Sequence, residues 1–356
     1  LLKLHFKATA AQIGIFGATW SIFYFISCIV FPRITRSMKP RYSLLIMLLG
    51  SALLFFVYLL KPTLAGTFLV YACFGILTAF YWPPLMSWLS KGYGITELAR
   101  ANGVFNFAWS LGGVLSAYIA GLLSESSRFL PIIVSASLFA LNALLILSSF
   151  LMLKDESQIQ EKQEKTKLSF NQQQNPNRIP AWLSNTLSYL VMGVLFNIFP
   201  IFAKDSLNFS ESTVGLILSI RALATMVGFI ILGRMHFWHF KSWLIPAAAA
   251  MMTLSIILLA VTHSSFVLAV CFVFIGLSMA STYTASLFYS TVNSSNKDTM
   301  VTIHESLLTF GQVVGSSLGG FIYMRSSFGA ILVIFSAIIV VSILLQLFYF
   351  SKIKVR

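Results

Sequence analysis

His304 and Glu305 stand side by side in the segment TIHESLLTFGQVVGSSLGG, residues 302 to 320, which carries no other ionisable side chain. A zinc-protease helix carries HExxH, in which the second His follows the first by four residues. Leu308 occupies that position here, so the pair does not form this metal site. A carboxylate in an apolar segment can instead exchange a proton or form an ion pair.

Arg221 is a second charged residue inside an apolar segment, which runs from residue 212 to 233. Charge within hydrocarbon costs several kcal/mol unless it is paired or hydrated, which makes both residues functional candidates. Three roles stay open: an ion pair between Arg221 and Glu305, a headgroup position for Glu305, or proton exchange by Glu305 near Arg221. His304 points about 100° away from Glu305 on a helix, which favours a structural or interfacial role for the histidine.

The composition places these segments in a membrane. The 356 residues are 58% hydrophobic and 10% charged, with a mean hydropathy of +0.86, and this leaves too little polar surface for a water-soluble particle. Apolar runs long enough to cross about 30 Å of hydrocarbon as helices recur along the chain. They lie near residues 11–31, 43–61, 67–90, 102–123, 130–152, 180–203, 212–233, 243–261, 265–289, 301–323 and 327–350. We therefore expect an all-α polytopic membrane protein with eleven transmembrane helices.

The basic residues behind the net charge of +14 lie mainly in the expected loops, which argues against a nucleic-acid-binding surface. Of the 24 Lys and Arg residues, 17 fall on one side of the expected helices, 6 on the other, and the last is Arg221. The positive-inside rule then places the C-terminus and the 154–179 segment in the cytoplasm. We expect an integral protein of the bacterial cytoplasmic membrane that binds lipid and no nucleic acid.

A polar, Gln-rich segment at 154–179 divides the chain into an expected N-terminal bundle, 1–153, and a C-terminal bundle, 180–356. Shifting the second half by 201 residues places Gly215 on Gly14, and a shift of 199 later places Gly311 on Gly112. Such a parallel repeat is typical of transporters built from two related bundles. The helix at 180–203 has no partner in the first half, and no initiator Met is present. We therefore expect an incomplete copy of a longer protein that lacks its first helix.

Two related bundles joined by a charged loop resemble the major facilitator superfamily. The family's loop motif after the second helix, G-x-L-a-D-r-x-G-r-k, is similar to PRITRSMKPR at 32–41, although Arg36 replaces the acidic residue. The second-half loop begins with Gly233 and Arg234 but carries Phe237 at the acidic position. The resemblance implies two pseudo-symmetric helical bundles that move a solute by alternating access.

Small residues recur in two equivalent helices and partly resemble the family's antiporter motif. Because the spacing occurs in both halves, we predict helix packing rather than antiport chemistry. The predicted packing glycines are Gly112, Gly121, Gly311, Gly315 and Gly319.

Seven polar or aromatic residues are candidates for a substrate cavity. Two prolines in FYWPPLMSW, 80–88, predict a bend in the helix expected at 67–90, which corresponds to the family's fourth helix. The bend would expose neighbouring side chains. Interhelical hydrogen bonding and interfacial aromatics explain the same residues equally well. The candidates are Tyr81, Trp82, Asn106, Trp109, Asn197, Tyr283 and Gln312.

Other chemistry is not indicated by the sequence. His236 and His239 have a ligand-like spacing without a nearby Cys or carboxylate, so we expect no metal and no cofactor. No nucleophile with a base and no phosphate loop is found, which argues against an enzyme. We expect a secondary active transporter (permease) for a small solute, coupled to protons as a symporter or antiporter. The alternative is a membrane protein of the same fold that acts as a sensor, lipid-interacting factor or assembly partner.

Overall fold

A computed structural model describes residues 2–3, 5–31, 34, 38–82, 84–85, 95–152, 175–235, 237–292 and 297–354, with backbone alone at 95–103, 106, 151–152, 297–299 and 353–354. The described residues form twelve helices and no strand. Ten of the helices are long and apolar enough to cross a membrane. The protein is therefore all-helical and integral to a membrane, as its composition predicts.

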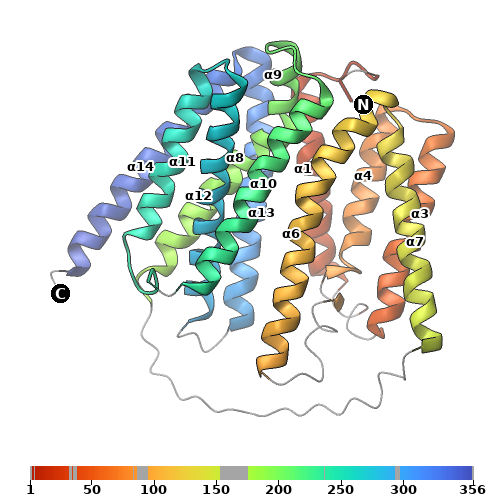
Figure 1. The fold of residues 1–356 in the computed structure, drawn as a ribbon, viewed down its shortest axis with the longest axis horizontal. Helices are drawn as coiled ribbons and strands as arrows, with labels where there is room; N and C mark the ends of the chain where they lie inside the picture. Colours follow the sequence, from red (N-terminus) through yellow and green to blue (C-terminus); the bar gives the residue numbers. More distant parts are fainter. Residues whose placement is uncertain are drawn as a thin grey trace. The chain divides into compact units, whose positions relative to one another are not determined.

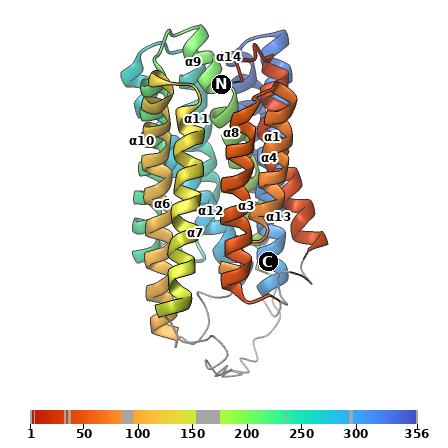
Figure 2. The ribbon, with the colours of Figure 1, turned by 90° about the vertical axis from the view of Figure 1, so that its right-hand side faces the viewer.

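The helices run lengthwise beside one another within each part of the chain (Figures 1 and 2). The first part contributes five: α1 (Ala10–Val30), α3 (Pro40–Leu60), α4 (Leu64–Thr78), α6 (Ile95–Ser126) and α7 (Leu130–Met152). The second part contributes seven: α8 (Arg178–Asn197), α9 (Phe199–Asp205), α10 (Glu211–Arg234), α11 (Leu244–Val261), α12 (Ser265–Thr291), α13 (Lys297–Arg325) and α14 (Phe328–Lys354).

Two compact units divide the chain differently from the expected bundle boundaries. Unit 1 contains residues 1–8, 19–109 and 123–167, and unit 2 contains residues 9–18, 110–122 and 168–356. In unit 1, α3 packs against α4 and α7 around Leu45, Met47, Leu48 and Ala143. The first nine residues of α1, 10–18, and residues 110–122 of α6 are thus grouped with the second unit, a division that the sequence repeat does not predict.

The helix α4 is shorter than its apolar run predicts. The expected span was 67–90, but the α-helix ends at Thr78, and Ala79, Phe80 and Tyr81 each donate to the carbonyl three residues earlier. The repeat-related helix α12 has no proline in this region and continues to Thr291. Because proline removes a backbone donor and disfavours helix in the preceding residue, Pro83 and Pro84 account for the difference. The α-helix is therefore interrupted after Thr78, although Trp82, Pro84 and Leu85 are helical again, and α4 is not among the ten long spans.

The span expected at 180–203 is also interrupted. The helix α8 ends at Asn197, and the short α9 begins at Phe199 with Pro200 in its first turn. Proline is favoured in the first turn of a helix, where its missing N–H has no partner to lose.

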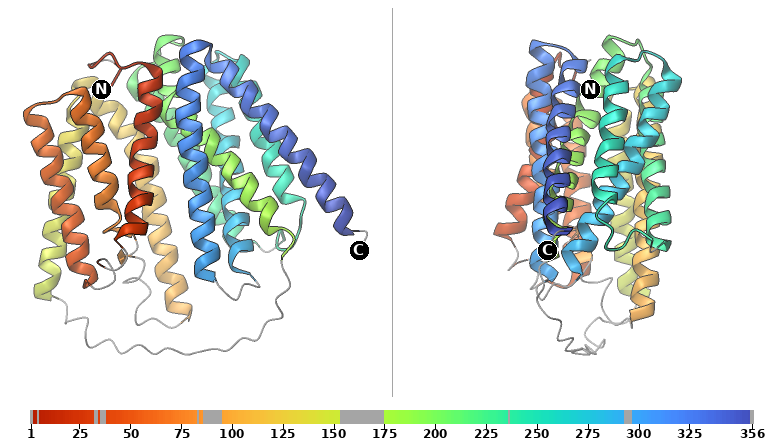
Figure 3. Two further views of the ribbon diagram at one scale, coloured as in Figure 1. Left: turned by 180° about the vertical axis from the view of Figure 1, so that it is seen from behind. Right: turned by 90° about the vertical axis from the view of Figure 1, so that its left-hand side faces the viewer.

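Glycines allow α13 to approach α8 closely, and Figure 3 shows α13 in blue beside α8 in green. A Cβ added at Gly311 would meet the carbonyl of Thr186, one at Gly315 the carbonyl of Leu190, and one at Gly319 the side chain of Val194. The three glycines are spaced four residues apart on α13, and their three contacts are spaced four residues apart on α8, so together they form one continuous line of contact.

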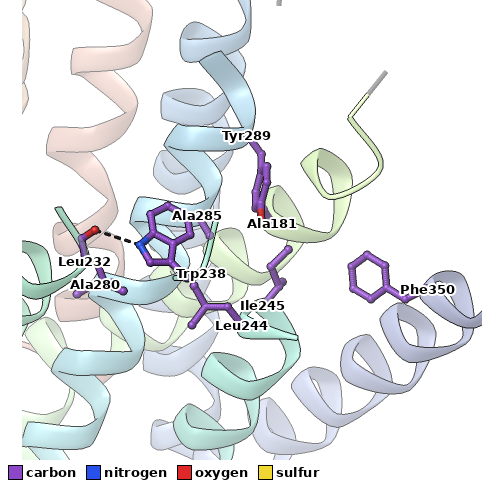
Figure 4. Packing of buried hydrophobic residues seen from close by; sticks show 9 residues of the cluster. All are labelled: Ala181, Leu232, Trp238, Leu244, Ile245, Ala280, Ala285, Tyr289 and Phe350. Carbon is purple, nitrogen blue, oxygen red and sulfur yellow. Dashed lines mark hydrogen bonds between the residues drawn. The ribbon is translucent and has the colours of Figure 1, made fainter. Parts of the chain in front are cut away.

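The connection between α10 and α11 is held by an aromatic cluster instead of the charged residues of the family motif. Trp238 is 2% exposed, and its indole N–H donates to the Leu232 carbonyl at 3.0 Å (Figure 4). The Trp238 ring also meets Phe288 edge-on, with 5.1 Å between the ring centroids. Phe237, at the family's acidic position, is 52% exposed. Apolar packing therefore fixes this loop.

Candidate functional site

Arg221 and Glu305 lie on helices that both pack against α12. The helix α10, which carries Arg221, packs mainly against α12, and α12 in turn packs against α13, which carries Glu305. Within the part of the chain that the structure describes, the two side chains form no ion pair. The described residues therefore show Arg221 and Glu305 unpaired with each other, and the ion-pair role that the sequence left open stays a prediction.

Glu305 presents a half-exposed carboxylate from an otherwise apolar helix. Its side chain is 53% exposed, and its carboxylate interacts with the Tyr283 side chain from α12. Thr309, one turn further along α13, donates its hydroxyl to the Glu305 backbone carbonyl at 2.8 Å. The carboxylate therefore reaches the surface of the protein while its helix remains intact.

His304 is fully buried rather than interfacial. Its Nδ1 atom lies 2.7 Å from the Ser286 hydroxyl on α12, and its ring meets Tyr283 edge-on at 5.0 Å. Its Nε2 atom lies 3.8 Å from Oε1 of Glu305 and has no hydrogen-bond partner among the described residues. The histidine thus ties α13 to α12 and remains close to the carboxylate, despite the direction that ideal helix geometry assigns to it.

Arg221 is buried with few polar contacts. It is 7% exposed, its guanidinium carbon lies 5.0 Å from the centroid of the Phe196 ring, and an Nη1 hydrogen bond of 3.7 Å reaches the Met279 sulfur. Its Nε atom has no hydrogen-bond partner among the described residues. A thioether is a weak acceptor, so the cation is poorly satisfied within the protein.

Tyr189 connects the two charged residues and was not among the sequence candidates. This tyrosine of α8 lies within electrostatic range of both Glu305 and Arg221, and its ring centroid lies 6.5 Å from that of Tyr283. A tyrosine in an apolar helix resembles any packing or interfacial aromatic in sequence. Only the approach of α8 to α12 and α13 reveals its position in the polar group, which we call the Arg221–Glu305 cluster: Tyr189, Arg221, Tyr283, His304 and Glu305.

The repeat shows which parts of this cluster belong to the fold. The Trp20 indole donates to the Thr78 hydroxyl at 3.2 Å, at positions equivalent to Arg221 and Met279. In the same way, Trp82 meets Phe105 edge-on at positions equivalent to Tyr283 and His304. The side-chain contacts are therefore repeated in unit 1 without charge.

Glycine positions show the same correspondence in the backbone. A Cβ at Gly75 would meet the Trp20 carbonyl, and one at Gly276 would meet the Arg221 carbonyl. Within unit 2, a Cβ at Gly14 would meet the Ser316 carbonyl, and one at Gly215 would meet the Ala117 carbonyl. The repeat relates these two contacts to each other. The repeat therefore fixes the backbone at Arg221, whereas the charge of its side chain is particular to the second half.

The predicted cavity residues fall into both units. In unit 1, Tyr81 packs against the α3–α7 core, and the ring centroids of Tyr81 and Trp82 are 5.0 Å apart. Trp109 is 54% exposed. In unit 2, Tyr283 belongs to the Arg221–Glu305 cluster, while Asn197 and Gln312 are half-buried. The Asn197 amide donates to the Gly193 carbonyl of its own helix at 3.0 Å. The Asn106 side chain, Arg33, Arg36 and most of the 154–179 segment lie outside the described residues.

The remaining glycines and histidines differ in their surroundings. A Cβ at Gly121 would meet the carbonyl of Glu211, whereas one at Gly112 would meet no atom of the described residues within 4 Å. Gly112 therefore lacks the close helix contact that its sequence spacing predicts. The described residues contain no group of three potential His, Cys, Asp or Glu metal ligands, and His236 lies outside them.

The model of the Major Facilitator Superfamily matches residues 1–179 and 181–355 of the chain. The chain belongs to the major facilitator superfamily. It is accordingly a secondary transporter of the membrane and not an enzyme. Multidrug resistance protein 1 of Bacillus subtilis (strain 168) is 22% identical over 326 residues, which cover 90% of this chain and 82% of that protein.

Solved structures of transporters share the fold. A bacterial homologue of the human lysosomal transporter Spinster, inward-facing and occupied, has a TM-score of 0.74 at 15% identity. That match covers 99% of this chain and 91% of the other. The nucleoside transporter NupG has a TM-score of 0.75 at 15% identity, covering 98% and 92%. At these identities the comparison concerns the fold alone.

Proposed function

We propose that this superfamily member couples solute movement to protons, with Glu305 as the group that takes up and releases the proton. The observation that carries the proposal is the half-exposed Glu305 carboxylate on a membrane-spanning helix, next to Tyr283 and outside any ion pair with Arg221 in the described part of the chain. A carboxylate that is neither locked in an ion pair nor sealed from solvent can change protonation during a transport cycle.

The solute is a small molecule, and the protein moves it by alternating access. Support comes from the family and from the repeat-related contacts, because two similar halves around a shared site are the usual basis of this mechanism. The excess of basic residues in one set of loops supports a cytoplasmic C-terminus and 154–179 segment, and the Bacillus relative supports a bacterial cytoplasmic membrane.

The test is proton movement in proteoliposomes that contain the protein and a trapped pH indicator. Pools of sugars, nucleosides, amino acids, organic anions and hydrophobic cations are pulsed in turn, with Glu305→Gln as a parallel sample. Solute-dependent proton flux that is lost in the variant supports the proposal. Counterflow of a solute without proton flux contradicts the coupling, and tight binding without any flux favours the sensor or assembly alternative.

A further inference from the structure

Arg221 is a buried cation without a counter-ion among the described residues. It is 7% exposed, its Nε atom has no hydrogen-bond partner among the described residues, and its Nη1 contact is a thioether sulfur. An uncompensated charge buried in a low-dielectric interior is costly. Such a residue is retained most readily if an anion binds it during the functional cycle.

The fold itself does not require this charge. The equivalent residue of unit 1 is Trp20, whose indole N–H donates to a hydroxyl, the side chain of Thr78, at 3.2 Å. Both helices keep the same glycine contact at this level, Gly75 with Trp20 and Gly276 with Arg221. A neutral residue therefore meets the structural need, so the arginine has a further role.

The neighbours of Arg221 indicate what the anion is attached to. The Phe196 ring, 41% exposed, lies 5.0 Å from the guanidinium carbon, and Tyr189, on the same helix as Phe196, lies within electrostatic range of Arg221. We infer that Arg221 binds the carboxylate, or a similar singly charged oxyanion, of an organic solute whose apolar body contacts Phe196 and Tyr189. Arginine suits this role because its planar fork binds oxyanions through two hydrogen bonds.

Charge balance extends the inference to the mode of coupling, and this step alone depends on the proposed role of Glu305. The charged and titratable groups around Glu305 are His304 on α13, Tyr283 on α12 and Tyr189 on α8, with Arg221 beyond Tyr189. Without solute, ionised Glu305 balances Arg221. With a bound monoanion, one proton on Glu305 restores the same net charge. The cluster therefore fits electroneutral symport of one organic anion with one proton.

Direct binding tests the anion site without reference to protons. Labelled 2-naphthoate is titrated into the purified protein, with unlabelled aliphatic and aromatic carboxylates and sulfonates as competitors and 2-naphthamide as the uncharged match. Because hydrogen bonds to charged groups contribute about 1.5–3 kcal/mol, we expect Arg221→Gln to weaken anion binding about 10- to 100-fold. Arg221→Lys should retain part of the affinity, and Arg325→Gln, which removes an exposed cation on α13, should change nothing.

Three results would overturn the inference: equal affinity for the acid and the amide, anion affinity unchanged in Arg221→Gln, or no binding by any anion of the panel. Binding of a hydrophobic cation that is lost in Glu305→Gln would assign the opposite substrate class. Circular dichroism and thermal unfolding of Arg221→Gln establish that the variant is folded, as the neutral Trp20 of unit 1 leads us to expect.

Transport in proteoliposomes tests the electroneutral step. Uptake of the bound anion should respond to an imposed pH gradient and remain unchanged when a potassium diffusion potential is applied. A clear dependence on membrane potential contradicts one-to-one symport. Uptake of the anion that ignores the pH gradient contradicts the proposed coupling through Glu305 but leaves the anion site at Arg221 standing.

Discussion

His304 Nε2 lies 3.8 Å from Oε1 of Glu305, yet the histidine is fully buried and the glutamate side chain is 53% exposed. Two adjacent residues of one helix thus meet different environments. The histidine is held by Ser286 on α12, whereas the carboxylate stays accessible beside Tyr283. This difference separates a structural from an exchangeable group, and it leads to distinct expectations for their variants.

Replacing His304 by Ala should lower stability much more than it changes the pH dependence of transport. The substitution leaves the buried Ser286 hydroxyl without its partner, a loss of about 1–3 kcal/mol in addition to the cavity. Thermal unfolding of purified His304→Ala, Ser286→Ala and the double variant measures the effect. If the two residues act through their contact, the effects will not be additive. A flat pH profile in folded His304→Ala would instead assign the proton to the histidine.

The glycine line between α8 and α13 gives a matched pair of variants. In Gly315→Ala, the new Cβ would collide with the Leu190 carbonyl, so we expect a destabilisation of about 1–3 kcal/mol, seen as a lower thermal unfolding temperature. In Gly112→Ala, no described atom lies within 4 Å of the new Cβ, and the unfolding temperature should not fall. Equal tolerance of both substitutions would show that α8 and α13 do not depend on this contact.

Trp238 should matter more than its neighbour Trp243. Trp238→Phe removes the indole donor of a 2% exposed side chain and with it the buried hydrogen bond to the Leu232 carbonyl, which costs about 1–3 kcal/mol. Trp243 is 52% exposed, so Trp243→Phe serves as the control with little expected effect. Chemical unfolding in detergent compares the two variants, and a larger loss for Trp243→Phe would contradict the aromatic packing of this loop.

Hydropathy predicted most helices well, because a long apolar run has few alternatives to a spanning helix. The expected 43–61 and 243–261 correspond closely to α3 (Pro40–Leu60) and α11 (Leu244–Val261). Hydropathy fails where a helix is interrupted but the residues on both sides of the interruption are apolar. Both failures, after Thr78 and after Asn197, lie near prolines at 83–84 and 200, so the sequence held a usable signal.

The candidate site was only partly predictable. Charge within apolar helices pointed to Arg221 and Glu305, and the repeat pairs them with the uncharged Trp20 and Asn106 of the first half. The sequence left an ion pair between them open, but the sequence alone does not report how their helices pack. The positions of Tyr189 and α12 depend on packing between segments about 100 residues apart, which periodicity within one helix does not report.

The most direct measurement of the central claim is solute accumulation driven by an imposed pH gradient in proteoliposomes, compared between the native protein, Glu305→Gln and Glu305→Asp. We predict accumulation in the native protein, at least partial accumulation with the shorter acid Asp, and none beyond equilibrium with Gln, while solute binding and counterflow persist in all three. Full gradient-driven accumulation by folded Glu305→Gln would contradict the account.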